Sequence, residues 1–390
     1  MDSASDRVTG LFHNFEQIKF PAQLPELTNS IIIALFFLTV IVTRTVNNGK
    51  TTGLLHVRHT DQLKGIAIFF VILGHFWVHV TSVRPFPLLA CDALSMFLLL
   101  SGFGLTISSG MHKIDFKSFF QKRIKRVMTP YWVATAIILA LDYILLGKIL
   151  HPQNIILTFL GLNITPELDH LDYVRWFVTF ILAWYILFFL VQKSTRLSRN
   201  ALTYLSLGLG FALIEYYLLR FGWYQFLSFP VGCILAFKIR QLNTRWEKDR
   251  KPLLCLAITA LLVAIVYKMI MHSEQIWPHI VQTVPNIMLI FMEEGNSILL
   301  GLGLLVLIGY FGEKGIESKV LHLLGRYSYE LFLIHGVFLI KYNPFLVYPE
   351  PLSTLIGFFL LLLFITVLSA GLSEVTRRAY KIYSQPAVLK

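Results

Sequence analysis

Asp61-Gln-Leu-Lys64-Gly-Ile-Ala-Ile-Phe-Phe-Val-Ile-Leu-Gly-His75 is the most informative stretch of this chain. An acid and a base introduce an apolar run, and a histidine follows Lys64 by eleven residues within that run. Since a helix rises about 1.5 Å per residue, Lys64 at a membrane surface would put His75 roughly 16 Å away, near mid-membrane. Ionisable side chains are costly at that depth, so the histidine predicts a functional site.

The rest of the chain supports a membrane setting for this stretch. Hydrophobic residues make up 56% of the 390 residues and charged residues only 14%. Apolar runs near or above the roughly 20 residues that a helix needs to cross a bilayer fall at 22–44, 64–82, 88–109, 129–148, 175–193, 202–219, 223–239, 252–271, 285–311, 323–341 and 352–373. The runs lack the alternation of lipid-facing strands, so we predict an all-α polytopic bundle of about ten core transmembrane helices plus one extra N-terminal helix.

Lysine and arginine alternate from one connecting segment to the next. Segments 110–127 and 238–251 carry six basic residues each, whereas the segments between the basic ones are poor in them. Basic loops stay in the cytoplasm, which predicts an N-terminus outside and a C-terminus inside. The net charge of +12 therefore indicates topology and contact with anionic lipid, and nucleic acid is the weaker interpretation.

The ends of the chain and its cysteines add little chemistry. Residues 1–21 lack a secretory signal and are expected to form an extracytoplasmic segment before the additional helix 22–44. Residues 374–390 should form a cytoplasmic tail. Cys91, Cys233 and Cys255 are far apart and without ligand spacing, so we expect packing roles and no metal site.

Three further blocks accompany the opening stretch, in which a basic residue is followed by ten others and a histidine. They are Phe97-Leu-Leu-Leu-Ser101-Gly102-Phe103, Arg123-Ile-Lys-Arg126-Val-Met-Thr-Pro130-Tyr131-Trp132 and Gly325-Arg-Tyr-Ser328-Tyr329-Glu-Leu-Phe-Leu-Ile-His335. Because these blocks occur in this order and at this spacing, the domain at 58–373 resembles the acyltransferase 3 family of membrane acyltransferases. The block at 176–185 departs from the family because it lacks a glutamate that many members carry there. An esterase-like domain found in some members is also absent, so the resemblance is to a stand-alone version.

This resemblance implies a multi-pass enzyme of the bacterial inner membrane. Its expected reaction transfers acetyl from cytoplasmic acetyl-CoA, a substrate rather than a bound cofactor, to a hydroxyl of a cell-surface or lipid-linked carbohydrate. The alternative is a transporter of a lipid-linked sugar or small solute, with a polar path through His75, Asp92, Glu293 and His335. A non-catalytic membrane anchor would explain the spans but not the spacing of the buried histidine.

His75 is the expected catalytic residue, because imidazole can remove the acceptor's proton or carry the acyl group. The alternative is a buried histidine that bonds a carbonyl of a neighbouring helix. Lys64, Arg123 and Arg126 are expected to bind the phosphates of acetyl-CoA, with the arginines on one helical face. Lys64 could instead extend to the membrane surface, and the arginines could simply hold orientation.

Supporting roles are expected for a second set of polar residues, on the acceptor side or around the histidine: Asp61, Asp92, Ser101, Tyr329 and His335. Asp92 begins the span after His75 and could orient the imidazole or line the acceptor entrance. His335 could belong to a polar network or line a pocket, or it could make a hydrogen bond that packs one helix against another. Glu293 and Glu294 interrupt the run 285–311, which favours a break in that helix. The outer segment 148–174, beside the aromatic residues Tyr173 and Trp176, could select the acceptor or be a solvated connector.

Overall fold

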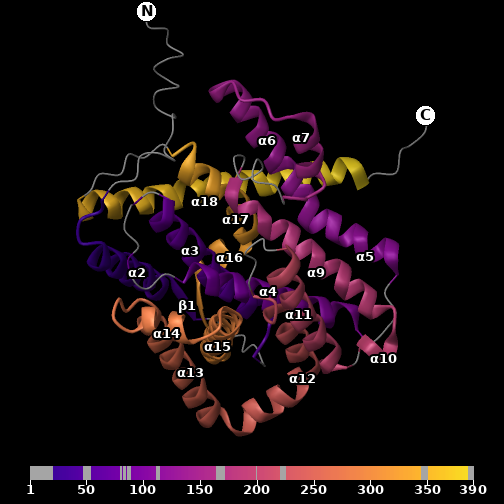
Figure 1. The fold of residues 1–390 in the computed structure, drawn as a ribbon, viewed down its shortest axis with the longest axis vertical. Coiled ribbons are helices and arrows are strands. Elements are labelled where there is room, and N and C mark those ends of the chain that lie inside the picture. The colour runs from indigo at the N-terminus through magenta and orange to yellow at the C-terminus, as the bar shows by residue number, and fades with distance from the viewer. Residues whose placement is uncertain are drawn as a thin grey trace, which may run out of the picture.

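The computed structural model describes residues 21–46, 54–79, 81, 85, 89–110, 115–163, 172–198, 200–219, 225–343 and 350–384. Most of these residues lie in helices, which confirms the all-α polytopic fold (Figure 1). The predicted N-terminal segment 1–21 falls outside the described residues except for its last residue. The predicted tail 374–390 begins as a continuation of the last helix, which runs to Ser384.

The helices follow one another along the chain with short connections. In chain order they are α2 (Pro25–Val42), α3 (Val57–His79), α4 (Ala90–Ser109), α5 (Phe116–Arg123), η1 (Ile124–Met128), α6 (Thr129–Leu146), α7 (Pro152–Phe159), η2 (Tyr173–Arg175), α9 (Trp176–Gln192), α10 (Thr195–Ser198), α11 (Ala201–Ile214), η3 (Glu215–Leu219), α12 (Ser228–Lys248), α13 (Arg250–Met271), α14 (Trp277–Thr283), α15 (Asn286–Glu313), α16 (Lys319–Arg326), α17 (Ser328–Ile340) and α18 (Pro351–Ser384).

Among the described residues, eight helices are long and apolar enough to cross a membrane, or nine if the bent pair α16 and α17 forms one span. The sequence predicts about eleven, and two of its runs account for the difference. The run 202–219 folds as the 14-residue α11 followed by the π-helical η3. The run 223–239 begins α12, whose second half carries Arg240, Arg245 and Lys248. Neither is one uninterrupted apolar helix of spanning character.

Helix α3, which contains the opening stretch, packs backbone to backbone against α16. A Cβ atom at Gly65 would meet the carbonyl oxygen of Leu321, and one at Gly325 would meet that of Asp61. Small residues at such crossings let membrane helices approach closely. After this crossing the chain bends by 76° into α17, whose histidine reaches back to α3.

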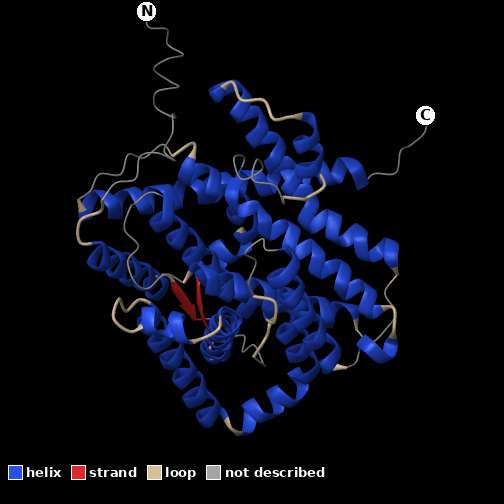
Figure 2. Ribbon diagram, viewed as in Figure 1, coloured by secondary structure: helices blue, strands red, loops and turns tan. Residues whose placement is uncertain are grey.

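A short antiparallel pair of strands fastens the extra N-terminal helix to the bundle. Strand β1 (Arg44–Val46) follows α2 and pairs with β2 (Ile316–Ser318), with Arg44 opposite Ser318 and Val46 opposite Ile316. Figure 2 shows the two strands beside α15. The backbone N–H of Lys319 also donates to the carbonyl oxygen of Thr43, over 3.1 Å. The end of α2 is therefore held to the junction between α15 and α16.

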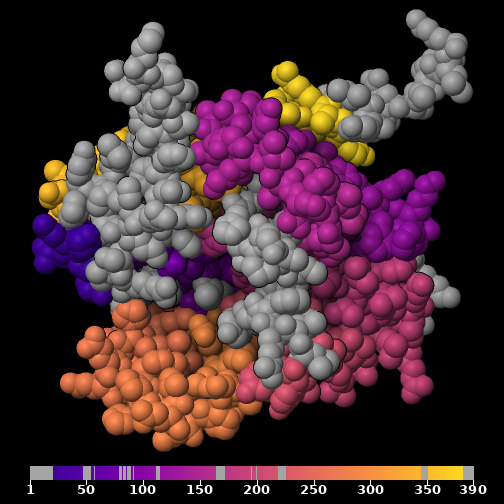
Figure 3. Space-filling model, turned by 45° about the horizontal axis from the view of Figure 1, so that its top comes forward, coloured from indigo at the N-terminus to yellow at the C-terminus, as the bar shows by residue number. Residues whose placement is uncertain are grey.

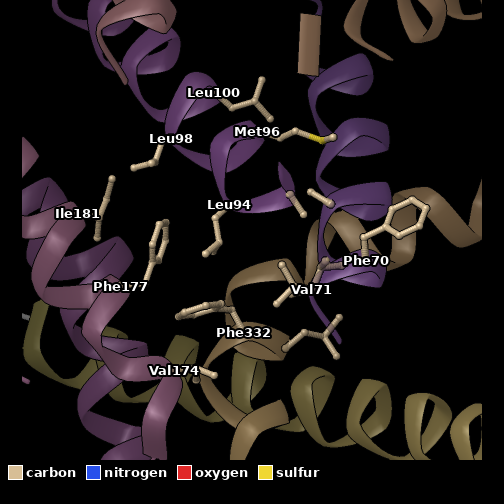
Figure 4. Packing of buried hydrophobic residues seen from close by; sticks show 14 of the residues in the cluster. Phe70, Val71, Leu94, Met96, Leu98, Leu100, Val174, Phe177, Ile181 and Phe332 are labelled. Atoms are coloured by element: carbon tan, nitrogen blue, oxygen red, sulfur yellow. The ribbon is translucent and has the colours of Figure 1, made fainter. Parts of the chain in front are cut away.

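The interior around α3 is filled with apolar side chains. Figure 4 shows Val71 of α3 beside Leu94 of α4 and Phe332 of α17, with Phe177 of α9 beyond them, whereas Phe70 points away from this group; all of them are buried. Lipid tails are as apolar as these side chains, so van der Waals packing rather than water exclusion holds the helices together. This shell borders the polar site described next.

Candidate active site

Two histidines from distant parts of the chain meet inside the bundle. The Nδ1 atom of His75, on α3, lies 2.8 Å from the Nε2 atom of His335, on α17. The two rings are nearly parallel, with centroids 5.0 Å apart and planes at 12°. His335 is fully buried and His75 is half-buried. We call these two residues the histidine pair.

Hydrogen bonds fix the tautomers of the neutral histidine pair. The Nδ1 atom of His335 lies 2.8 Å from the carbonyl oxygen of Phe332 and 3.1 Å from that of Leu331. A carbonyl oxygen only accepts, so this nitrogen carries the hydrogen and Nε2 of His335 holds a lone pair. His75 must then donate from Nδ1, which leaves the lone pair of His75 on Nε2. The arrangement places proton-accepting capacity at Nε2 of His75.

The histidine pair lies near one end of the bundle, not at its middle. The span that contains His75 is Arg58–Val78, so the histidine falls in its last turn. His335 is likewise five residues before the end of α17 at Ile340. The helix begins well before Lys64, the residue expected at the membrane surface, which sits two turns inside it. The depth of His75 in the membrane stays a prediction.

The start of α9 closes one side of the histidine pair. The ring of Tyr173 packs edge-on against the ring of His75, with centroids 5.3 Å apart and planes at 81°. Its neighbour Asp172 lies against α17, where a Cβ atom at Gly336 would collide with Asp172 Oδ1. The sequence expected Tyr173 near an acceptor site. Of the outer segment 148–174, residues 164–171 lie outside the described residues.

Asp172 and Arg175 form a buried ion pair beside the histidine pair. Arg175 Nε is 3.5 Å from Asp172 Oδ2, and both side chains are almost fully buried. Arg175 Nη1 donates to Thr135 Oγ1 over 2.6 Å, and the guanidinium lies over the ring of Tyr131. Burial raises the pKa of the Asp172 carboxyl to about 6, and the positive charge of Arg175 limits that rise. The carboxyl therefore titrates in an accessible pH range.

Lys64 lies in the first half of α3, away from His75, and forms an ion pair with Asp61 of the same helix. Its Nζ is 3.1 Å from Asp61 Oδ1, and the other oxygen of Asp61 is 4.0 Å from Nδ1 of His322 on α16. Lys64 keeps about a third of its side chain exposed, at 35%. The structure thus brings Lys64 and Asp61 together, at a distance from the histidine pair along α3.

Three of the other expected residues gather around a residue that the sequence did not single out, Tyr185. The guanidinium of Arg123 lies 5.5 Å from the centre of the Tyr185 ring. Ser101 and Arg123 are the polar neighbours of the Tyr185 hydroxyl, and Tyr185 in turn is an ionisable neighbour of Tyr329. The Tyr329 hydroxyl donates to the carbonyl oxygen of Val127 over 3.0 Å.

Arg126 is more exposed than Arg123. The chain between them enters the π-helical turn η1, which changes the helical register; Arg123 is half-buried and Arg126 is exposed. Arg126 is nevertheless a charged neighbour of both Arg123 and Tyr185, and their common role in donor binding stays a prediction. Single π-helical turns are rare and often occur at functional sites.

Asp92 belongs to a different polar group, which we call the charged cluster: Asp92, Lys268, Glu293 and Ser297. Lys268 Nζ lies 3.1 Å from Asp92 Oδ2 and 3.5 Å from Glu293 Oε1. Ser297 donates to Asp92 Oδ1 over 2.7 Å. These contacts join α4 to α13 and α15, which belong to one continuous region of the surface in Figure 3 (orange). His335, rather than Asp92, is the residue seen to orient the imidazole of His75.

The sequence favoured a break in the helix at Glu293 and Glu294. The structure has no break there, because α15 runs without interruption from Asn286 to Glu313. The cost of burying Glu294 is met by hydrogen bonds at the start of α12. Its Oε1 accepts from the backbone N–H groups of Leu227 and Ser228. A carboxylate at a helix N-terminus is favourable because the first N–H groups lack partners within the helix.

Sequence reasoning missed Arg175, Lys268 and Tyr185. Arg175 was counted as a sparse charge of an outer segment, although it is 1% exposed. Lys268 carried a usable signal, since it lies inside the apolar run 252–271 and a charge in such a run normally marks a partner or a site. Tyr185 lies in an apolar run without a distinguishing pattern.

Comparison with known proteins identifies the family of this chain. A family model described as an acyltransferase domain, of the acyltransferase 3 family, matches residues 59–374. No curated protein and no solved structure matches the chain. The matched region covers most of the chain and contains the histidine pair, Lys64 and the two arginines. The protein therefore belongs to the acyltransferase 3 family of multi-pass membrane acyltransferases.

Proposed function

We propose that this protein is a membrane O-acyltransferase that transfers acetyl from cytoplasmic acetyl-CoA to a hydroxyl of a cell-surface or lipid-linked carbohydrate. The observation that carries the proposal is the 2.8 Å contact between Nδ1 of His75 and Nε2 of His335. Acyl transfer to a hydroxyl needs a base that removes the acceptor's proton. The contact supports this role, because it holds His75 in the tautomer whose Nε2 can accept the proton.

In the proposed step, Nε2 of His75 takes the hydroxyl proton while the hydroxyl oxygen attacks the carbonyl carbon of the thioester. A C–O bond forms, and collapse of the tetrahedral intermediate breaks the C–S bond. The imidazolium of His75 then returns the proton to the departing thiolate, so CoA leaves as the thiol. His335 acts as a positioning residue, because its Nε2 accepts the Nδ1 hydrogen of His75 and stabilises the imidazolium.

The donor enters from the other end of the bundle in this proposal. Lys64, Arg123 and Arg126 bind the phosphates of acetyl-CoA, and the predicted positive-inside topology puts them on the cytoplasmic side. A series of polar side chains supports a route from Arg123 toward the histidine pair. Tyr185 neighbours Arg123, Tyr329 neighbours Tyr185, and Tyr329 also has Tyr131 and Arg175 as ionisable neighbours.

The acceptor hydroxyl reaches the histidine pair from the opposite, outer side. The predicted orientation, with the N-terminus outside, puts the last turn of α3 near that surface. Tyr173, whose ring packs against His75, provides an aromatic face of the kind that sugar rings pack on. Asp92 has no part in this step, and we propose that it holds helices together.

The transporter alternative has less support. It requires one polar path through His75, His335, Asp92 and Glu293. In the structure the histidines bond each other, whereas Asp92 and Glu293 share the ammonium group of Lys268. Family membership and this separation both favour the enzyme.

The test is acetyl transfer from labelled acetyl-CoA to surface or lipid-linked glycan in membranes that contain matched amounts of protein. We expect His75→Ala to lower transfer roughly 10³-fold, because it removes the base. His279→Ala is the matched control, since His279 is exposed on α14 and should leave transfer unchanged. Equal transfer by His75→Ala and wild type would contradict the role of His75, and movement of solute without use of acetyl-CoA would favour the transporter.

A further inference from the structure

A cavity of about 220 Å³ lies far from the histidine pair, at the junction where α2 meets the rest of the bundle. Helices α2, α3, α15 and α16 and strand β2 all contribute to its walls. The lining residues are Val40, Ile41, Arg44, His59, Gln62, Ile308, Phe311, Gly312, Ile316, Glu317, Ser318 and Leu321. The residues proposed for catalysis and for donor binding are not among them.

The polar groups of the wall are largely occupied by one another. Gln62 bonds the backbone of Ser318 in both directions, donating to its carbonyl oxygen and accepting from its N–H, each over 3.0 Å. Glu317 lies 3.8 Å from Arg58. The surface left to a ligand is therefore mostly hydrocarbon, supplied by residues such as Val40, Ile41 and Ile308. An apolar chain fits such walls better than water does.

The rim of the cavity faces the membrane. Ile41 is 56% exposed and Phe311 is 47% exposed, on helices α2 and α15 that both qualify as membrane spans. Large apolar side chains exposed on a spanning helix are in contact with lipid tails. A chain that enters the cavity from this side therefore comes from the bilayer itself.

Arg44 gives the cavity a charged mouth. It lies two residues beyond the end of α2 at Val42, at the level where a spanning helix reaches the lipid headgroups. Among the residues that the structure describes, the Arg44 side chain has no hydrogen bond or ion pair. The nearest acid on the lining, Glu317, already faces Arg58. The mouth thus favours an anion directly beside apolar walls.

We propose that this cavity binds one acyl chain of an anionic phospholipid, whose phosphate rests on the guanidinium of Arg44. An arginine fork suits a phosphate group, and the apolar walls suit the chain that is attached to it. The bound lipid would strengthen the attachment of α2, which β1 and β2 hold to the junction of α15 and α16. A ligand that binds only the folded protein raises its melting temperature.

The first experiment measures the melting temperature of the full-length protein in detergent with added lipid. Dioleoyl phosphatidylglycerol should raise it by several degrees, and dioleoyl phosphatidylcholine, with the same chains, should raise it less. Arg44→Gln should abolish this difference between the two lipids. Arg196→Gln is the matched control, since Arg196 is an exposed arginine on α10 and should keep the difference. An unchanged difference in Arg44→Gln would overturn the proposal.

A second measurement needs no variant and is therefore independent of folding defects. Phosphatidylglycerol that carries a photoreactive group in its chain is cross-linked to wild-type protein, and the adducts are mapped. We expect adducts concentrated in 40–46 and 308–318, the walls of the cavity. Adducts spread evenly over other lipid-facing helices such as α13 would overturn the proposal. Equal stabilisation by free oleate would also overturn it, because it would identify the occupant as a fatty acid.

Discussion

The histidine pair and the charged cluster lie in the same bundle, yet they differ in charge and in chemistry. The histidine pair consists of two aromatic rings that share one hydrogen bond. The charged cluster surrounds the ammonium group of Lys268 with the carboxylates of Asp92 and Glu293. One group carries no net charge when its rings are neutral, and the other sets two carboxylates against one ammonium group.

This difference indicates what each region contributes. Charges buried in a membrane protein are costly unless they are paired. The charged cluster is therefore suited to holding α4, α13 and α15 together. A neutral imidazole can accept a proton and return it within one reaction cycle, so the histidine pair is suited to catalysis.

The largest effect that would sharpen this contrast is expected from Lys268→Met. Removal of the shared cation leaves the Asp92 carboxylate buried and uncompensated, which should lower the free energy of unfolding by about 3–5 kcal/mol. Thermal unfolding in detergent measures this loss. The double variant Asp92→Asn with Lys268→Met should recover most of the stability. Transfer activity per folded molecule should remain close to wild type, and a loss of activity without a loss of stability would break the contrast.

A smaller effect is expected at Asp172, the charged residue next to the histidine pair. Its pKa of about 6 in the folded protein lies above its ordinary value of 3.8, so the folded state holds this proton more tightly than the unfolded state does. Stability should therefore fall as pH rises from about 4 to about 6, by about 3 kcal/mol in total, and then level off. Asp172→Asn should remove this slope in melting temperature against pH. Identical slopes in the two proteins would contradict the buried carboxyl.

The smallest of these effects is expected at Glu294. This residue is adjacent to the charged cluster, but its carboxylate caps the N-terminus of α12. Glu294→Ala removes the acceptor for the first N–H groups of α12 and should cost about 1–2 kcal/mol of stability. Glu294→Gln keeps an acceptor oxygen and should cost less. The comparison of their melting temperatures checks the cap, and equal losses would assign the effect to charge instead.

The fold was largely predictable because composition and long apolar runs act locally. The runs predicted the helices at α3, α4, α9, α13 and α15 from neighbouring residues alone. The bend between α16 and α17 was not predictable, because it depends on the crossing of Gly325 with the backbone of Asp61. The same holds for the π-helical turn η1, which follows Arg123 and contains Arg126.

Some residues of the candidate site were expected from the sequence, but their pairings were not. His75 and His335 were both expected from their motifs, but the contact between them joins residues 260 positions apart. Asp92 was expected to orient the imidazole or to line the acceptor entrance, because it begins the next span. Its actual partner, Lys268, lies in a distant helix that no motif connects to it. Partners that meet through folding leave no mark in a single sequence.

The most direct test of the central claim is a double-mutant cycle on the histidine pair. Initial rates of acetyl transfer are measured for wild type, His75→Ala, His335→Ala and the double variant, each at matched abundance and with its melting temperature recorded. Because His335 acts through His75, His335→Ala should lower the wild-type rate about 10²-fold and should lower the His75→Ala rate no further. The same fractional loss in both backgrounds would show that the two histidines act independently and would contradict this account.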